Sequence, residues 1–130
     1  MDMVTATTDG VKVSVETFYQ KDYAGMATAE HVFAYRITIE NKGPVPVRLL
    51  RRHWHIFDSS NDWREVEGEG VVGEQPLIEP GGLHQYVSGC SIRGMAGKMF
   101  GTYTMERAHD NETFQVLIPE FRMIVPAVLN

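Results

Sequence analysis

Residues 33–44 read Phe-Ala-Tyr-Arg-Ile-Thr-Ile-Glu-Asn-Lys-Gly-Pro, and this stretch is the clearest indication of the fold class. Every second residue from Phe33 to Ile39 is large and apolar, while the residues between them are small or polar. A period of two is typical of a β-strand that buries one face. The closing Asn-Lys-Gly-Pro holds turn-forming residues, so the strand is expected to end there.

Shorter stretches with the same alternation lie on both sides of this strand. They begin near residue 11 and include 47–58, 63–66, 83–88, 99–105 and 114–125. Segments rich in Gly, Pro and Asp separate them, among them 58–62, 68–73 and 80–82. About seven short strands at this spacing, with no sustained helical period, predict an all-β domain that is an antiparallel sandwich or barrel.

The stretch 47–58 fits two interpretations. Leu50, Trp54 and Ile56 would share one face of a strand, whereas Leu50, Trp54 and Phe57 would share one face of a helix. The preceding Gly-Pro-Val-Pro-Val offers no Ser, Thr, Asp or Asn to cap a helix. We therefore predict a strand over 47–58, with Trp54 in the core.

The last predicted strand changes face part-way along. Its apolar residues share one parity before Pro119 (Phe114, Val116 and Ile118) and the other parity after it (Phe121, Met123 and Val125). Proline cannot donate a backbone hydrogen bond within a sheet. The sequence therefore predicts a bulge, a bend or a change of sheet partner at Pro119.

Two segments lack any alternation. Residues 1–9 are mostly polar and are predicted to form a frayed, flexible terminus. Residues 23–29 contain Gly25 and other small residues, and are predicted to form a loop or an irregular edge. No linker or internal repeat divides the rest, so we expect 1–130 to fold as a single domain.

The composition argues against a nucleic-acid-binding protein. The chain has 130 residues, a formal net charge of −5 and a pI of about 5.5. Proteins that bind nucleic acids usually present a basic face that neutralises phosphates. The densest basic cluster here is small, and consists of Arg48, Arg51 and Arg52 with Lys42 nearby.

Cysteine usage and hydropathy predict a cytoplasmic protein. Cys90 is the only cysteine, so no disulfide can form within the chain. The first residues lack the basic and apolar regions of a secretory signal. No apolar stretch approaches the roughly 18–20 residues that span a bilayer, so we expect no membrane insertion.

Residues 68–73 read Gly-Glu-Gly-Val-Val-Gly, the G-x-G-x-x-G pattern of dinucleotide-binding proteins. In those proteins a helix follows the glycines and binds pyrophosphate with its N-terminus. Here two prolines and two more glycines follow within residues 74–82, so that helix cannot form. Two interpretations remain: a tight loop whose glycines adopt positive φ, or a nest of backbone amides that binds an anion. For the second, Gly68, Gly70 and Gly73 would supply the nest, with Arg51 and Arg52 as its cationic partners.

His53 and His55 lie two residues apart, so on a strand they would share one face, at a spacing that suits metal ligands. Further ligands would have to come from elsewhere, and the candidates are Asp58, Asp62, His31 and His84. Glu65 and Glu67 also share a strand face, where they are expected to be solvated. The alternative is that both histidines are packing and surface residues.

No set of residues predicts an active site. Cys90 lacks a recognisable partner pattern, and an isolated thiol in a strand is usually inert packing. Ser88-Gly89 does not complete the G-x-S-x-G pattern of a nucleophile elbow. We therefore predict that the chain is not an enzyme.

Several stretches, in this order, resemble the ApaG family, also called CorD. They are 50–56 (Leu-Arg-Arg-His-Trp-His-Ile), 68–76 (Gly-Glu-Gly-Val-Val-Gly-Glu-Gln-Pro), 80–89, 97–105 and 114–121. The resemblance runs from about Gly10 to Pro126, and the 68–76 stretch is highly specific. It implies a fibronectin type III/immunoglobulin-like β-sandwich, and an association with cobalt resistance and magnesium efflux in bacteria. It supplies no catalytic residues.

Together these observations predict a non-enzymatic binding module that acts through an unidentified protein partner and needs no cofactor. The resemblance to ApaG implies that this partner links it to divalent-cation homeostasis. The alternative is a site for a phosphorylated small molecule, such as a nucleotide or pyrophosphate, at the Gly68–Gly73 loop. A divalent cation, cobalt or magnesium, could bind at His53 and His55. Because sandwich edge strands invite pairing, we also expect a homodimer.

Overall fold

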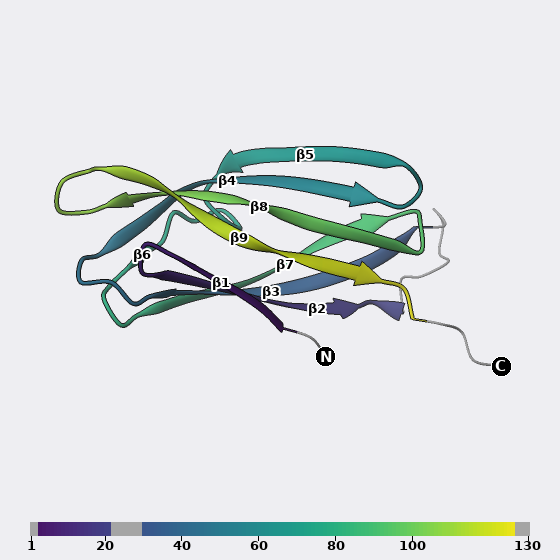
Figure 1. Ribbon diagram of the computed structural model, residues 1–130, viewed down its shortest axis with the longest axis horizontal. Helices are drawn as coiled ribbons and strands as arrows, with labels where there is room; N and C mark the ends of the chain where they lie inside the picture. Colours follow the sequence, from purple (N-terminus) through teal and green to yellow (C-terminus); the bar gives the residue numbers. More distant parts are fainter. Residues whose placement is uncertain (1–2, 22–29, 127–130) are drawn as a thin grey trace.

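The protein folds as two antiparallel β-sheets packed face to face, seen in a computed structural model that describes residues 3–21 and 30–126 (Figure 1). The first sheet contains β1 (Met3–Thr8), β2 (Val11–Tyr19), β3 (His31–Asn41) and β7 (Leu83–Ile92), in that order. The second contains β5 (Asp62–Glu69), β4 (Val47–Asp58), β8 (Ala96–Arg107) and β9 (Thr113–Ile124), in that order. The two-residue β6 (Leu77–Ile78) also pairs with β4.

The predicted all-β antiparallel sandwich is confirmed, and its strand order is that of a fibronectin type III/immunoglobulin-like domain. If β2, β3, β4 and β5 take the letters A, B, C and C′, then β7, β8 and β9 are E, F and G. Strands A, B and E then form one sheet, and C, F and G lie in the other. β1 and β6 are additional to the strands that the sequence predicted.

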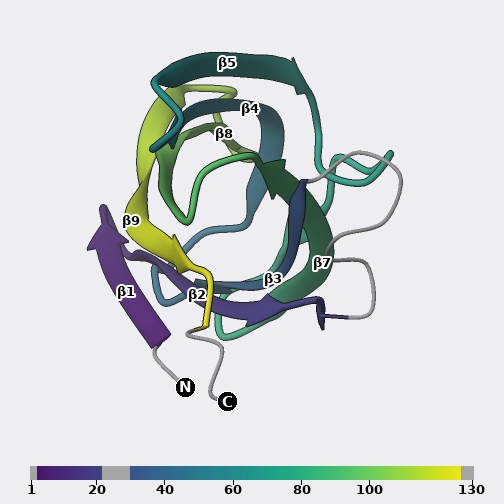
Figure 2. The same cartoon turned by 90° about the vertical axis from the view of Figure 1, so that its right-hand side faces the viewer.

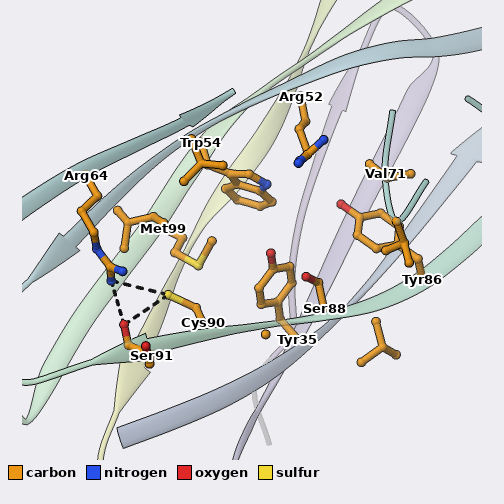
Figure 3. Close-up of a pocket in the computed structure, with 15 residues that line it drawn as sticks. Tyr35, Arg52, Trp54, Arg64, Val71, Tyr86, Ser88, Cys90, Ser91 and Met99 are labelled. Carbon is orange, nitrogen blue, oxygen red and sulfur yellow. Dashed lines mark hydrogen bonds between the residues drawn. The ribbon is translucent and has the colours of Figure 1, made fainter. Parts of the chain in front are cut away.

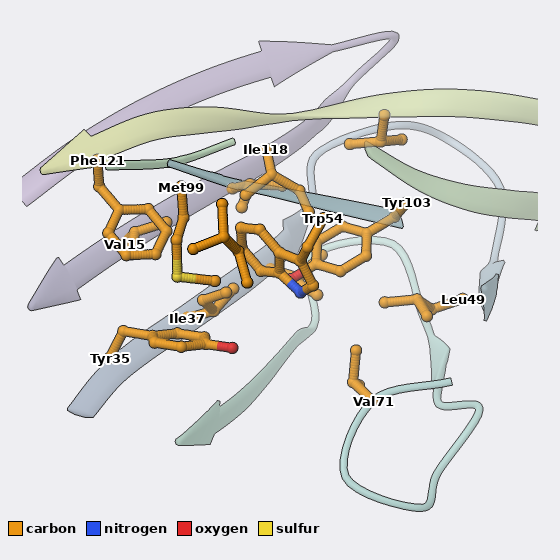
Figure 4. Packing of buried hydrophobic residues seen from close by; sticks show 14 of the residues in the cluster. Val15, Tyr35, Ile37, Leu49, Trp54, Val71, Met99, Tyr103, Ile118 and Phe121 are labelled. Atoms are coloured by element: carbon orange, nitrogen blue, oxygen red, sulfur yellow. The ribbon is translucent and has the colours of Figure 1, made fainter. Parts of the chain in front are cut away.

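The core lies between the sheets and is built from the alternating apolar positions. Ile37, Ile39 and Tyr103 are fully buried, and Trp54 is 3% exposed, so its predicted place in the core is confirmed. The Trp54 ring meets Tyr35 at 5.6 Å and Phe121 at 5.8 Å between ring centroids, both edge to face (Figure 4). Such aromatic pairs add to the stabilisation from area burial alone.

The strand predicted over 47–58 is confirmed as β4, but Leu50 is not one of its core residues. A register shift between Leu49 and Arg51 places a β-bulge at Leu50. The bulge reverses which parity faces inward, so Leu49 is fully buried and Leu50 is only half-buried. The Leu50 carbonyl accepts bonds from the Gly70 amide (2.8 Å) and Gln75 Nε2 (2.9 Å).

At Pro119 the structure has a bulge, the first of the three predicted alternatives. Met99 on β8 pairs with Phe121, and Gly101 pairs with Ile118. Pro119 and Glu120 therefore oppose the single residue Phe100. The extra residue shifts the inward-facing side chains of β9 from even-numbered positions before the bulge to odd-numbered positions after it. Proline has no backbone N–H to donate. At Pro119 this costs no hydrogen bond between β8 and β9, because the bulge already interrupts their pairing there.

The N-terminal segment differs from the prediction of a flexible terminus over 1–9. Met3–Thr8 form β1, which pairs along its whole length with Val11–Glu16 of β2. Its side chains alternate between exposed and half-buried, because one face lies over the edge of the sandwich. The loop predicted over 23–29 falls outside the described residues.

The two long sides of the sandwich differ. On one side β9 lies against β1 and β2, and the Leu117 amide donates to Thr8 Oγ1 at 3.2 Å. On the other side lie the edge strands β5 and β7 (Figure 2). Within residues 3–21 and 30–126, β5 pairs only with β4, and β7 pairs only with β3. A gap between the sheets therefore opens along β5 and β7.

Asp58 fastens one end of the sandwich. It is 2% exposed and accepts hydrogen bonds from the backbone amides of Arg93 (2.7 Å), Gly94 (2.8 Å) and Ser60 (3.0 Å). Burial by itself raises the pKa of Asp58. The hydrogen bonds from these three residues outweigh burial, so the pKa lies below its ordinary value of 3.8.

We expect Asp58 to make the free energy of unfolding depend on acidity. Since its folded-state pKa is the lower one, its contribution is fully present above the ordinary value of 3.8 and is lost as the pH falls through the folded-state value. In urea unfolding, Asp58→Asn should cost about 1–3 kcal/mol near neutral pH. The difference from the wild type should shrink as the pH falls below 3.8 and through the folded-state pKa of Asp58. A difference that stays constant with pH would contradict this role.

Candidate functional site: the cleft between β5 and β7

A cleft of about 510 Å³ lies between the two sheets, on the side where β5 and β7 form the edges. Its floor is formed by Tyr35, Trp54 and Met99 (Figure 3). Its rim carries two exposed valines, Val66 from β5 and Val72 from the glycine loop. Val87 of β7 also borders the cleft, but it alternates with the inward-facing Tyr86 and Ser88, so its side chain lies on the outer face of the sheet. The cleft is therefore a groove with apolar and polar side chains, bordered by two strand edges, the general form of a site for a chain segment or small molecule.

Arg52 extends from β4 into one end of this cleft (Figure 3). One guanidinium nitrogen, Nη1, donates to the carbonyls of Glu69 and Gly70, both at 3.0 Å. Among residues 3–21 and 30–126, no carboxylate lies within ion-pair distance of Arg52. The guanidinium thus brings a positive charge without a carboxylate partner to the groove, where it would favour an anionic group.

Arg64 extends from β5 at the other end of the cleft and bridges the two edges. Its Nη2 donates to the Ser91 carbonyl on β7 at 2.7 Å, and its Nε lies 3.4 Å from Asp62 Oδ2. Arg64 therefore has a carboxylate within ion-pair distance, although its buried Nε makes no hydrogen bond to the described residues. Of the two cleft arginines, Arg52 is the one without a carboxylate nearby among these residues.

The remaining polar groups of the cleft are protonated at neutral pH. The hydroxyls of Tyr86 and Tyr103 are hydrogen-bonded to each other across the sheets, and burial raises the pKa of both. Burial also raises the pKa of the Cys90 thiol, an effect that nearby Arg64 only partly offsets. A thiol in this state is a poor nucleophile, which fits its expected role as inert packing.

The glycine motif shapes the loop beside Arg52. Val71 and Glu74 form an isolated antiparallel bridge, and Val72 and Gly73 between them have φ values of 48° and 77°, as a type I′ hairpin turn requires. The Gly70 amide donates to the Leu50 carbonyl, and the Val71 amide donates to the Glu74 carbonyl. These two amides of the proposed anion nest are thus occupied by protein acceptors.

Gly70 is required by a close backbone contact, and Gly68 leaves room for the Arg52 guanidinium. A Cβ on Gly68 would lie 2.7 Å from Arg52 Nη1, because the guanidinium packs on the Gly68 backbone. Gly70 has φ +64°, and its Cβ would lie 2.1 Å from the Glu74 carbonyl oxygen. The motif therefore acts as a scaffold that holds Arg52 in the cleft.

The structure separates the other predicted site residues. Arg51 is exposed, one position along β4 from Arg52 and on the opposite face of the strand. His53 and His55 also lie on that outer face, opposite Glu67 and Glu65 of β5. The four further ligands suggested from the sequence (Asp58, Asp62, His31 and His84) do not join this cluster. Asp58 instead binds backbone amides, and His31 contacts the Tyr19 hydroxyl at 3.1 Å.

Comparison with known proteins places this site in a family. A family model described as the ApaG domain matches residues 22–107, which include β3 to β8, the glycine loop and Arg52. The chain belongs to the ApaG family. "Protein ApaG" of Nitrosomonas eutropha is 48% identical over 120 residues, 92% of this chain and 94% of that protein. "Protein ApaG" of Sinorhizobium fredii is 42% identical over 127 residues, 98% of this chain and 97% of that protein.

Solved structures agree with the ApaG assignment. The X-ray structure of a structural-genomics target superposes with a TM-score of 0.85 and 37% identity, covering 96% of this chain and 94% of its own. A crystal structure from Bordetella pertussis gives a TM-score of 0.84 and 37% identity, covering 91% and 95%. The names and folds of these ApaG relatives give no indication of catalysis. In the described residues of this chain, no helix has the length and apolar character needed to cross a membrane.

Proposed function

We propose that the protein is a non-catalytic binding module that takes an acidic, extended segment of a protein partner into the cleft between β5 and β7. The observation that carries this proposal is Arg52, a guanidinium without a carboxylate partner among the described residues, set in a groove between two strand edges. An extended segment suits a groove bordered by two strand edges, because it can also bond their backbone groups. The segment's carboxylate would pair with Arg52, and its apolar side chains would contact Val66 and Val72.

In this proposal the link to divalent-cation homeostasis is indirect and runs through the partner. The module supplies recognition, and the partner supplies any transport or regulation. The acidic surface of the chain narrows the range of partners. Its negative charges repel an acidic segment unless a carboxylate of that segment reaches Arg52.

The test compares variants that change the cleft with matched variants elsewhere on the surface. Arg52→Ala removes the guanidinium, and Arg51→Ala removes the neighbouring one on the opposite face. Val66→Asp places a negative charge on the rim, where Val66 is 40% exposed, and Leu117→Asp places the same charge on β9, where Leu117 is 52% exposed. Each variant is used as bait in a bacterial lysate, and its melting temperature is measured.

We expect one partner to be captured by the wild type, Arg51→Ala and Leu117→Asp, and lost with Arg52→Ala and Val66→Asp. Removing one member of a buried charge pair typically costs 2–5 kcal/mol, so the affinity of Arg52→Ala should fall by roughly thirtyfold or more. Val66→Asp keeps Arg52 and its loop contacts, and so separates binding from loop folding. Equal capture by all the variants, or turnover of a phosphate ester with no partner found, would refute the proposal.

A phosphorylated small molecule is the second candidate, and the same guanidinium favours it. Arg52 can offer a phosphate two parallel hydrogen bonds, but the Gly70 and Val71 amides have protein acceptors. Such a ligand would therefore bind at Arg52 in the cleft. Calorimetry with pyrophosphate, ATP and diadenosine tetraphosphate tests it: heat that Arg52→Ala abolishes supports this candidate, and no heat at millimolar ligand removes it.

A further inference from the structure

On the outer face of the second sheet, away from the cleft, we propose a transition-metal site formed by His53, His55 and Glu65. One ligand atom from each of the three residues lies within 4.8 Å of the other two. The site is separate from the proposed partner-binding cleft, because these side chains lie on the opposite face of β4 from Arg52 and Trp54.

Strand register brings the ligands together. His53 and His55 are two positions apart on β4, so both project from one face of the sheet. The β4–β5 hairpin places Glu65 directly opposite His55, and Glu67 directly opposite His53. Directly opposite residues have Cβ atoms about 4.5–5.5 Å apart, which is within the reach of a shared ion. The site is thus built on paired strands and not on a loop.

The ligand atoms lie close to the spacing that a tetrahedral ion requires. Glu65 Oε2 lies 3.3 Å from His53 Nε2, and Glu65 Oε1 lies 3.6 Å from His55 Nδ1. Bonds of about 2.0–2.2 Å at tetrahedral angles place neighbouring ligand atoms roughly 3.3–3.6 Å apart. Since the two distances end on different oxygens of Glu65, rotations of its carboxylate and of the two rings would complete the set. Both rings are about one-third exposed, so an ion could enter from solvent.

Two contacts orient the histidine rings. Glu67 Oε1 lies 3.6 Å from His53 Nδ1, the ring nitrogen that faces away from Glu65. Without a metal, the closer contact is the hydrogen bond between His53 Nε2 and Glu65 at 3.3 Å. With a metal on Nε2, Glu67 would be placed to accept the Nδ1 proton, as carboxylates do in many zinc proteins. The His55 ring stacks on Phe100 with a centroid distance of 5.1 Å and an interplanar angle of 15°. The rings are therefore held with their metal-binding nitrogens toward Glu65.

The donor set selects the class of metal. Two imidazoles and one carboxylate suit zinc, nickel, copper and cobalt, whereas magnesium binds oxygen ligands almost exclusively. The three protein ligands lie on one side of the ion, which leaves the solvent side for water or for a group from a partner. The site is thus assigned to a transition metal and not to magnesium.

The experiment titrates tag-free, chelator-treated protein with Co²⁺ and Zn²⁺, following visible absorption for Co²⁺ and heat for both ions. We expect one ion per chain, with visible bands typical of tetrahedral cobalt. Glu65→Gln and His55→Asn should each weaken binding by roughly a hundredfold or more, and Glu67→Gln by about tenfold. Glu69→Gln, on the same strand, and His109→Asn, far from the cluster, are the matched controls and should bind as the wild type does.

Melting curves without metal verify that these surface variants remain folded. Absence of saturable binding at micromolar Co²⁺ would overturn the proposal. So would an affinity that Glu65→Gln and His55→Asn leave unchanged, since the four residues would then form only His–Glu ion pairs. Neither result bears on the cleft, whose variants leave His53, His55 and Glu65 intact.

Discussion

Trp54→Ala is expected to lower the free energy of unfolding by about 3–5 kcal/mol, the usual cost of deleting a large buried aromatic side chain. Trp54 is 3% exposed and packs against Tyr35 and Phe121, which come from both sheets. Tyr35 belongs to β3 and Phe121 to β9, which lie in different sheets. Movement of a single hairpin therefore cannot fill the cavity that Trp54→Ala would leave. In a domain with roughly 5–15 kcal/mol of total stability, the variant should express poorly.

The measurement is thermal unfolding, in which Trp54→Ala should melt roughly 10–20 °C below the wild type. Trp63→Ala is the matched control, because Trp63 is 59% exposed on the outer face, where its ring lies 4.6 Å from that of Phe57 between centroids, tilted by 48°. It should cost less than about 1 kcal/mol, as most surface substitutions do. An unchanged melting temperature for Trp54→Ala would be incompatible with the observed core.

Gly70→Ala is expected to destabilise the protein by about 2–4 kcal/mol, from backbone strain and a steric clash together. At φ +64° an alanine is strained, and its Cβ would lie 2.1 Å from the Glu74 carbonyl oxygen. The hairpin would have to move, and the Gly70–Leu50 hydrogen bond would weaken with it. Since the Gly70 carbonyl also accepts a bond from Arg52, the cleft should lose its partner as well.

Gly73→Ala separates the two causes. Gly73 has φ +77°, but no atom lies within 4 Å of the position its Cβ would take. It should therefore cost only the strain, about 1–2 kcal/mol. If instead the loop bound a ligand with its own amides, Gly70→Ala would lose binding while its melting temperature hardly moved. Melting curves and partner capture on the two glycine variants distinguish these cases.

The strands could be predicted from the sequence wherever one face is buried. β4 begins and ends where the alternation of residues 47–58 predicts, and the parity change at Pro119 marks a real bulge. The bulge at Leu50 gave no such signal, because Leu49 and Leu50 are both apolar and either could face the core. β1 gave none either, since its side chains are never fully buried.

The candidate sites could be predicted only in part. The alternation of side chains along β4 predicts that Arg52 and Trp54 share one face, which is the cleft face. It also predicts that Arg51 and the two histidines lie on the other face. The hairpin register would have added Glu65 to His53 and His55. The cleft itself depends on which strands end up at the edges of the sheets. Local periodicity cannot provide that information, because it is set by pairing between distant parts of the chain.

The contact between β1 and β9 also shapes how the chain reaches this fold. The bond from the Leu117 amide to Thr8 joins residues 109 positions apart, so this side of the sandwich closes only when the two ends of the chain meet. The chain must lose the entropy of closing this long loop before the contact can stabilise the fold. Folding therefore belongs to the slow, millisecond-to-second class of all-β domains. Hairpins such as β4–β5, which carries the histidine cluster, can form well before the sandwich shuts.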